Sequence, residues 1–244
     1  MLSVLLSVMV PASMCLPQEN SDLLDLIGRA EQSYQKISGY TCRMHRTELI
    51  GGKYKVQKNV LVKYRKPGSF YLKWTEGQGK GSESLYVKGE NNDKMLVHLP
   101  GLYKFFVFSM APGGKRALKN NRHTIEQVHF GFFIDMIKHN LDMAKSDPTA
   151  MIKIKEEEML DGVPTLSIVG EFGGDREYYG KRVAINIAKE NCLPVKIDVF
   201  GEDDHLLESY YFTDIVLNAK LSDSDFAPDN PEYGFKKRKV YDLD

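Results

Sequence analysis

The residues with the right types for metal chemistry form one short acidic run. Glu202, Asp203, Asp204 and His205 are adjacent, and they follow a strand-like segment in the position of a hairpin turn. Side chains that are neighbours on a tight turn do not converge on one ion, and a zinc site needs about four converging ligands. We therefore expect neither a metal nor another cofactor.

Histidines suited to acid–base chemistry gather in the middle of the chain, at His123, His129 and His139. Their spacing is not the i, i+4 spacing of a helical metal site, and the chain has no His-Glu-x-x-His motif. It also has no Gly-x-Ser-x-Gly motif for a serine nucleophile. We expect His129 to be a partly buried, hydrogen-bonded histidine, and we expect the protein not to be an enzyme.

A hydrolase nevertheless remains a third hypothesis, ranked behind two binding functions. It predicts that His98, His129 or His205 lies within hydrogen-bond reach of an acid and a nucleophile in one pocket. Cys42 is a poor nucleophile candidate, since His45 lies three residues along a strand and so points to the opposite face. Residues 77–82 are rich in glycine but lack the spacing of a phosphate-binding loop.

Length and charge narrow the class of protein. The chain has 244 residues, of which 42% are hydrophobic, and its 33 Lys and Arg balance 33 Asp and Glu. A nucleic-acid partner is not expected, because phosphate binding requires a basic excess. We expect one domain over residues 17–236, followed by a charged tail over 237–244. The basic run 236–239 is expected to be solvated.

The first residues suggest export. Residues 1–16 are apolar over about ten positions before Pro11-Ala12-Ser13, which fits a secretory signal and is too short to span a membrane. Lipidation at Cys15 is not expected, since Met14 occupies a position where a small residue belongs. We expect an exported protein of the periplasm or cell envelope. Cys42 and Cys192 then either pair or remain independent thiols.

Hydrophobic periodicity predicts two helices and a series of strands. Helices are expected over residues 21–37, with Ser21 as N-cap, and over 125–145, after a capping box of Thr124 and Gln127. Alternation of apolar and polar residues predicts strands at about 40–44, 56–64, 70–74, 84–88, 94–99, 102–109, 151–158, 164–172, 183–187, 195–199 and 211–217. This order predicts an α+β fold, in which helices cover one face of a curved antiparallel sheet.

Several phrases of the sequence resemble known families. They include Tyr34, Ile37, Gly39 and Tyr40 at the end of the first helix, residues 66–68 after the second strand, and the closing segments 211–221, 225–226 and 230–235. Over about residues 20–236, the chain resembles the domain-of-unknown-function family numbered 1571. More broadly, it resembles the Lol carriers of bacterial outer-membrane lipoproteins. The resemblance implies a half-open antiparallel barrel whose mouth is closed by helices, with an apolar cavity for acyl chains.

The expected function is non-enzymatic binding of a lipid or an acylated protein in the bacterial cell envelope. Aromatic and aliphatic residues from the sheet and the second helix would line the cavity, since Phe supplies area and Met adapts its shape. The predicted ligand-binding residues are Phe70, Leu72, Trp74, Phe105, Phe132, Phe133, Met136 and Ile137, with Tyr103 and Val107 as further candidates on the sheet. The same residues filling a solid core is the competing interpretation.

A second hypothesis is an envelope sensor or regulatory module on the same fold, in which ligand occupancy controls a protein partner. The expected partners are therefore a lipid or acyl chain, or a lipoprotein that carries one. Peripheral association with the envelope and the oligomeric state are left open by the sequence.

Overall fold

One curved sheet of twelve strands forms the body of the part of the chain that is described. The computed structural model describes residues 18–173, 177–236 and 238–243. The strands are β1 Gly39–Ile50, β2 Lys53–Arg65, β3 Ser69–Trp74, β4 Glu83–Val87, β5 Met95–His98, β6 Phe106–Met110, β7 Met151–Leu160, β8 Val163–Glu171, β9 Arg182–Ala188, β10 Pro194–Phe200, β11 Leu206–Leu217 and β12 Lys239–Asp242.

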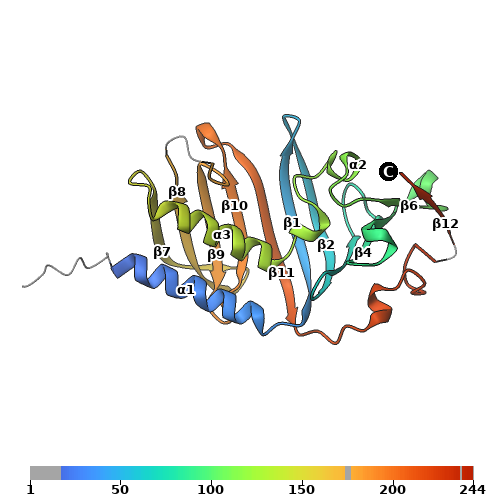
Figure 1. Cartoon of the computed structure of the whole chain (residues 1–244), viewed down its shortest axis with the longest axis horizontal. Helices are drawn as coiled ribbons and strands as arrows, with labels where there is room; N and C mark the ends of the chain where they lie inside the picture. The colour runs from blue at the N-terminus through green and yellow to red at the C-terminus, as the bar shows by residue number, and fades with distance from the viewer. Residues whose placement is uncertain (1–17, 174–176, 237, 244) are drawn as a thin grey trace, which may run out of the picture.

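The strand order is β12-β6-β5-β4-β3-β2-β1-β11-β10-β9-β8-β7. Two antiparallel meanders, β1 to β6 and β7 to β11, therefore join where β1 pairs with β11. The end strands β7 and β12 do not pair with each other, so the sheet is open, as Figure 1 shows. This confirms the predicted α+β half-barrel.

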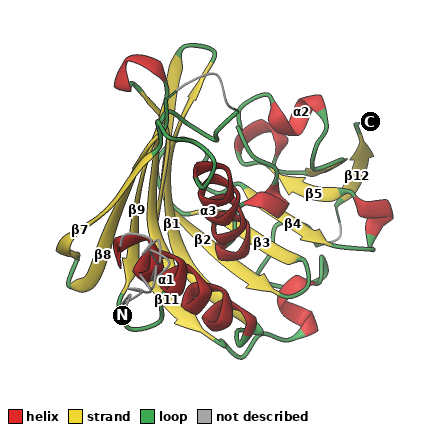
Figure 2. Ribbon diagram, turned by 60° about the vertical axis from the view of Figure 1, so that its left-hand side comes forward, coloured by secondary structure: helices red, strands yellow, loops and turns green. Residues whose placement is uncertain are grey.

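Two long helices lie on the concave face of the sheet (Figure 2). They are α1 Gln18–Gln35 and α3 Phe130–Ala144, and a shorter helix, α2 Lys115–Leu118, follows β6. The first helix starts three residues before the predicted N-cap Ser21, so that prediction was wrong. Among the described residues, no helix is long and apolar enough to cross a membrane.

The predicted helix 125–145 is divided in two. The capping box of Thr124 and Gln127 is present, but it begins only the 3-10 turn η3 Ile125–Gln127. The backbone leaves helical geometry at Val128, and His129 then caps α3 by accepting a 3.0 Å hydrogen bond from the N–H of Gly131. A second cap within the segment was not evident from periodicity, because an N-capping histidine is uncommon.

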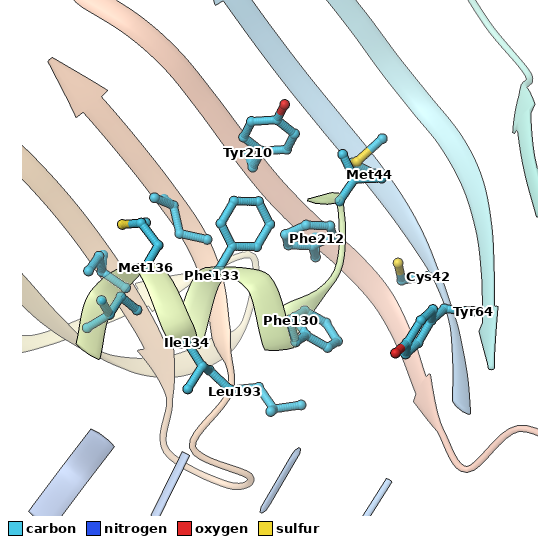
Figure 3. Close-up of a cluster of buried hydrophobic side chains, with 14 of the residues drawn as sticks. Cys42, Met44, Tyr64, Phe130, Phe133, Ile134, Met136, Leu193, Tyr210 and Phe212 are labelled. Carbon is cyan, nitrogen blue, oxygen red and sulfur yellow. The ribbon is translucent and has the colours of Figure 1, made fainter. Parts of the chain in front are cut away.

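The main core fills the space between the concave face and the two long helices. Alternation along the strands places Cys42, Met44, Tyr210 and Phe212 on this face, each at most 2% exposed. Figure 3 shows the α3 residues Phe130, Phe133 and Met136 among these side chains. Cys42 and Cys192 are free thiols, and burial raises the pKa of Cys42 well above its usual range.

A second, smaller core lies on the opposite face, where the chain after β11 crosses β3 and β4. Tyr233 stacks on Tyr71 with ring centroids 3.9 Å apart, and Phe226 and Phe235 join the same cluster. Beyond them, residues 239–242 form β12, which pairs in parallel with β6. These four residues of the predicted charged tail therefore extend the sheet, while Lys239 of the basic run expected to be solvated is exposed.

The predicted signal segment 1–16 and Cys15 lie outside the described residues.

Candidate functional site

Most of the predicted ligand-binding residues lie in a packed core. Phe70, Leu72, Phe133, Met136 and Ile137 are between 0% and 7% exposed. The void beneath α3, lined in part by Met136 and Ile137, measures about 20 Å³. A cavity of roughly 10–15 Å³ holds a single water molecule, so this void has no room for an acyl chain. The space between α3 and the sheet is thus solid.

Three of the predicted residues lie elsewhere. Phe105 is 66% exposed in the connection from β5 to β6, and Val107 belongs to the core on the opposite face. Phe132 is partly buried at the edge of the main core and contacts the ring of His123 edge-on. The structure therefore does not bring the predicted set together around one cavity.

An open cleft of about 510 Å³ lies instead on the concave face. Strands β2 to β6 form one side of this cleft, and α2 forms the other. This volume is within the roughly 300–1,000 Å³ range of small-molecule sites. We call it the Trp74 cleft. Its apolar wall consists of Val56, Trp74, Met95, Val97, Leu99, Met110 and Ala117, and its polar residues are Lys55, Gln57, Gln78, Ser82, Ser84, Arg116, Asn120 and Asn121.

The charges of the Trp74 cleft are all of one sign. Its lining includes Lys55 and Arg116, and no carboxylate is among the described residues that form it. An apolar wall with a cationic rim suits a ligand that has a hydrocarbon part and an anionic end. A second depression of about 450 Å³ is lined by the carboxylates of Asp161, Glu190 and Asp214, and it is a poorer match for such a ligand.

A chain of hydrogen bonds holds the two sides of the Trp74 cleft together. Trp74 Nε1 and Arg46 Nε each donate a 2.7 Å bond to the side-chain oxygen of Gln57. Arg46 also donates to Asn121 Oδ1 at 2.5 Å, and the amide of Asn121 donates to the carbonyl of Ala117 in α2 at 2.6 Å. The indole and α2 are therefore tied to one buried guanidinium.

A small pocket of about 60 Å³ lies beside the cleft and shares lining residues with it, among them Trp74 and Met95. Leu72 and Trp74 line it, as do Arg46 and His123. Two of the predicted residues, Leu72 and Trp74, therefore reach hollow space, although not the space beneath α3 for which they were proposed.

Behind this pocket lies a buried group of charged residues, which we call the Glu208 cluster. Glu208 is 0% exposed and accepts hydrogen bonds from Arg122 Nε at 2.7 Å and from the hydroxyl of Tyr179 at 2.6 Å. His123 Nε2 is 3.0 Å from the same carboxylate and 2.6 Å from the Tyr179 oxygen. Burial alone would raise the pKa of Glu208, but His123, Tyr179 and Arg122 outweigh it and lower that pKa.

A second carboxylate completes the Glu208 cluster. Glu48 is 1% exposed, accepts a 2.5 Å hydrogen bond from the hydroxyl of Tyr210, and has Arg46 at 3.9 Å. The two glutamates thus face two arginines, which is the pairing that buried charges require. Burial raises the pKa of both Tyr179 and Tyr210, so both phenols stay protonated as donors.

The three histidines proposed for a hydrolase bind other groups. His98 Nε2 is 3.2 Å from the carbonyl of Lys104, and His205 Nδ1 is 2.5 Å from the carbonyl of Glu202. His129 Nδ1 lies 3.0 Å from the Tyr34 hydroxyl, and burial lowers the pKa of His129 to about 4. His123, which was not among these three, does contact an acid, the carboxylate of Glu208. Its other hydrogen-bond neighbour is the protonated hydroxyl of Tyr179. No group of three or more metal-ligand side chains occurs within the described ranges.

Sequence reasoning passed over the Glu208 cluster, although a signal for it exists. Arg46 and Glu48 continue the inward-facing series of Cys42 and Met44, and Glu208 precedes Tyr210 in the same phase of β11. A charged residue in the inward phase of a strand is expected to find a buried partner. Because β1 and β11 pair with each other and both carry inward-facing charges, this pattern would have predicted the cluster.

One family matches most of the chain. Residues 37–235 match the family described as a protein of unknown function, DUF1571. The chain belongs to this family. The sequence-based prediction of DUF1571 membership is thus confirmed, and no curated protein matches the chain.

Solved structures resemble this DUF1571 protein in fold. An uncharacterized conserved protein from Thermus thermophilus has a TM-score of 0.51 at 9% identity, covering 91% of this chain and 99% of that one. MucB has a TM-score of 0.50 at 11% identity, covering 85% of this chain and 62% of MucB. The lipoprotein LppX of Mycobacterium tuberculosis has a TM-score of 0.49 at 14% identity, covering 83% and 98%. At these identities the first two similarities establish the fold alone.

Proposed function

We propose that this DUF1571 protein is a non-enzymatic binder of an amphipathic lipid or acyl chain of the bacterial cell envelope, and that the ligand occupies the Trp74 cleft. The observation that carries the proposal is the cleft itself, with about 510 Å³ of open space between an apolar wall and a cationic rim. The hydrocarbon part would lie against Trp74, Met95 and Met110. The anionic end would face Lys55 and Arg116.

Energetics favour such a ligand. Burying roughly ten methylene groups at about 0.8 kcal/mol each yields a gross gain of about 8 kcal/mol before the cost of ordering the ligand. Two methionines in the wall suit chains of varied shape, because the thioether side chain is flexible and polarizable. The hydrogen-bonded indole of Trp74 provides a rigid surface that is already in place before binding.

The proposed location differs from the site predicted between α3 and the sheet. Phe133, Met136 and Ile137 are packed against other side chains, so occupation there would require α3 to move away from the sheet. The Trp74 cleft requires no such movement. Of the eight residues predicted from sequence, we retain Trp74 for the cleft, and Leu72 lines the small pocket beside it.

The test is native mass spectrometry of the full chain purified from a bacterial host, with extraction and identification of bound lipids. We expect a co-purifying lipid that is lost when Val97→Asp places a carboxylate in the cleft wall. Met136→Ala, beneath α3, is the matched control and should keep the lipid. Thermal unfolding of each variant establishes that it is folded.

Two results would overturn the proposal. One is a wild-type protein that carries no lipid and binds neither lysophosphatidylglycerol nor a fatty acid added in solution. The other is the reverse pattern, in which Met136→Ala loses the lipid while Val97→Asp keeps it. That pattern would return the site to the space beneath α3.

A sensor module that binds a protein partner is the second candidate function. It is supported by similarity of fold to MucB, a protein also solved in complex with MucA. In that case, cross-linking in the envelope should capture one defined protein, and cleft variants that change ligand occupancy should alter the yield of that cross-link.

A further inference from the structure

The connection from β5 to β6 exposes large apolar side chains to solvent. Leu102 is 91% exposed, Phe105 is 66% exposed and Tyr103 is 56% exposed. Three such residues within four positions form a continuous apolar tip, whereas single exposed apolar residues are common on any protein. Folding therefore leaves most of the surface of these three side chains exposed to solvent, in a segment that we call the Leu102 loop.

The Leu102 loop has a defined conformation. Residues Gly101–Tyr103 form a 3-10 turn, and the N–H of Lys104 bonds to the carbonyl of Gly101 at 3.2 Å. His98 lies 3.2 Å from the Lys104 carbonyl, and Tyr103 contacts Phe108 with ring centroids 6.1 Å apart. Because these contacts hold the base of the loop, Leu102 and Phe105 are displayed outward from a fixed support.

Lysines flank the apolar tip. Between Asp93 and Glu126 the sequence has no acidic residue. Lys94 and Arg122 of this stretch pair with Asp242 and Glu208, so its remaining cations are Lys104, Lys115, Arg116 and Lys119, all of them exposed. Lys104 Nζ lies 5.0 Å from the Phe105 ring centre. On the adjacent strand, Lys239 is the ladder partner of Phe106. Figure 1 shows α2, β6 and β12 together at the end of the molecule farthest from β7.

We propose that the Leu102 loop is a peripheral membrane-docking element that inserts Leu102, Tyr103 and Phe105 into the interface of an anionic phospholipid bilayer. Aromatic and aliphatic residues flanked by lysines are the combination that the bilayer interface favours, since the rings enter the headgroup region while the cations attract anionic lipids. A protein groove would also accept apolar residues. The flanking lysines, Lys104 and Lys239, favour the membrane.

The Leu102 loop lies next to one end of the Trp74 cleft, so docking of the loop would determine where the cleft sits relative to the bilayer. Leu99, which lines the cleft, leads directly into the loop, and Gly79 of the β3–β4 connection lines the cleft as well. That connection packs against the loop, since a Cβ on Gly81 would lie 3.4 Å from Pro100. A molecule docked through the Leu102 loop therefore holds one end of the cleft near the bilayer surface. Docking does not depend on the proposed function, because an empty cleft leaves the loop unchanged.

The experiment is flotation of the full-length protein with vesicles of equal parts phosphatidylcholine and phosphatidylglycerol, and with vesicles of phosphatidylcholine alone. We expect binding to the anionic vesicles that is weakened by added salt. The double variant Leu102→Ser/Phe105→Ser should bind them at least about tenfold more weakly, since two apolar side chains no longer insert. The matched control is Leu24→Ser/Met159→Ser, which removes two exposed apolar residues elsewhere and should bind like the wild type.

A wild type that fails to float with anionic vesicles would overturn the proposal, as would a loop variant that floats as well as the wild type. A loop variant that keeps vesicle binding but loses a co-purifying protein would assign the loop to a protein partner and would equally overturn it. Val97→Asp separates the two proposals, since it should abolish ligand binding in the cleft and leave flotation unchanged.

Discussion

Trp74 Nε1 donates a 2.7 Å hydrogen bond to the side-chain oxygen of Gln57, which lies on the neighbouring strand. The same oxygen accepts from Arg46, so one amide group orients both the indole in the cleft and the guanidinium behind it. Trp74 is the single tryptophan of the chain. Its fluorescence is therefore a direct report on the proposed ligand site.

This arrangement predicts that Gln57→Leu weakens ligand binding. Without the amide, Trp74 Nε1 and Arg46 Nε lose their shared acceptor, and we expect affinity for lysophosphatidylglycerol to fall about tenfold. Titration followed by tryptophan emission measures this. Gln78→Leu, also in the cleft lining and exposed, should change affinity by no more than about twofold. Equal effects of the two variants would contradict the role of Gln57.

The Glu208 cluster predicts a large loss of stability on truncation. Glu208→Ala leaves Arg122, His123 and Tyr179 without their shared acceptor, and each buried donor left unsatisfied costs about 1–3 kcal/mol. Urea denaturation gives the free energy of unfolding. The exposed Glu190→Ala should change it by less than about 0.5 kcal/mol. A loss of that small size for Glu208→Ala would show that the cluster does not stabilise the fold.

The partly buried His129 should lower the free energy of unfolding in acid. Its pKa is lowered from 6.5 to about 4, first by burial and then by the charge of Lys66. Between these pH values the unfolded chain binds a proton that the folded chain does not, so stability is complete above about pH 6.5 and declines toward pH 4. The contribution is roughly 3 kcal/mol. His129→Asn keeps an N-cap and should flatten this decline in urea titrations at several pH values.

His139, which is exposed on the same helix, provides the control for that experiment. His139→Asn should leave the pH dependence of the wild type in place. An unchanged slope in His129→Asn would mean that another group causes the acid sensitivity.

Two glycines predict opposite responses to the same substitution. A Cβ on Gly131 would lie 2.6 Å from Tyr34 Cε1 and 2.8 Å from His129 Cε1, whereas a Cβ on Gly28 in α1 meets nothing within 4 Å. Gly131→Ala should therefore cost about 1–3 kcal/mol by overpacking the contact between α1 and α3. Gly28→Ala should gain about 0.5–1 kcal/mol through helix propensity. Thermal unfolding distinguishes them, and changes of the same sign would contradict this packing.

Alternation along the chain was sufficient to predict eleven strands of the sheet, but not β12, which was predicted as part of the tail. Apolar residues at every second position, as in β10, occur wherever one face of a strand is buried, and that pattern is local. The last long strand begins at Leu206, five residues before the predicted start at 211. The prediction started too late because the charged Glu208 interrupts the series of apolar residues on the buried face. The predicted strand 102–109 begins only at Phe106, since Gly101 takes a positive φ and starts a turn.

The location of the hollow space could not be predicted in the same way. Phe133 and Met136 on one helix face signal burial, and the same signal arises whether the facing surface is a ligand or a sheet. Only the approach of α3 to β10 and β11, which side-chain volumes across the whole interface determine, makes that space solid. The sequence by itself therefore determined eleven of the strands, the half-barrel class and the family, whereas β12 forms only by pairing with β6. Tertiary packing decided which apolar residues became core, which line the Trp74 cleft, and which remain exposed at Leu102 and Phe105, because these outcomes depend on contacts between distant segments.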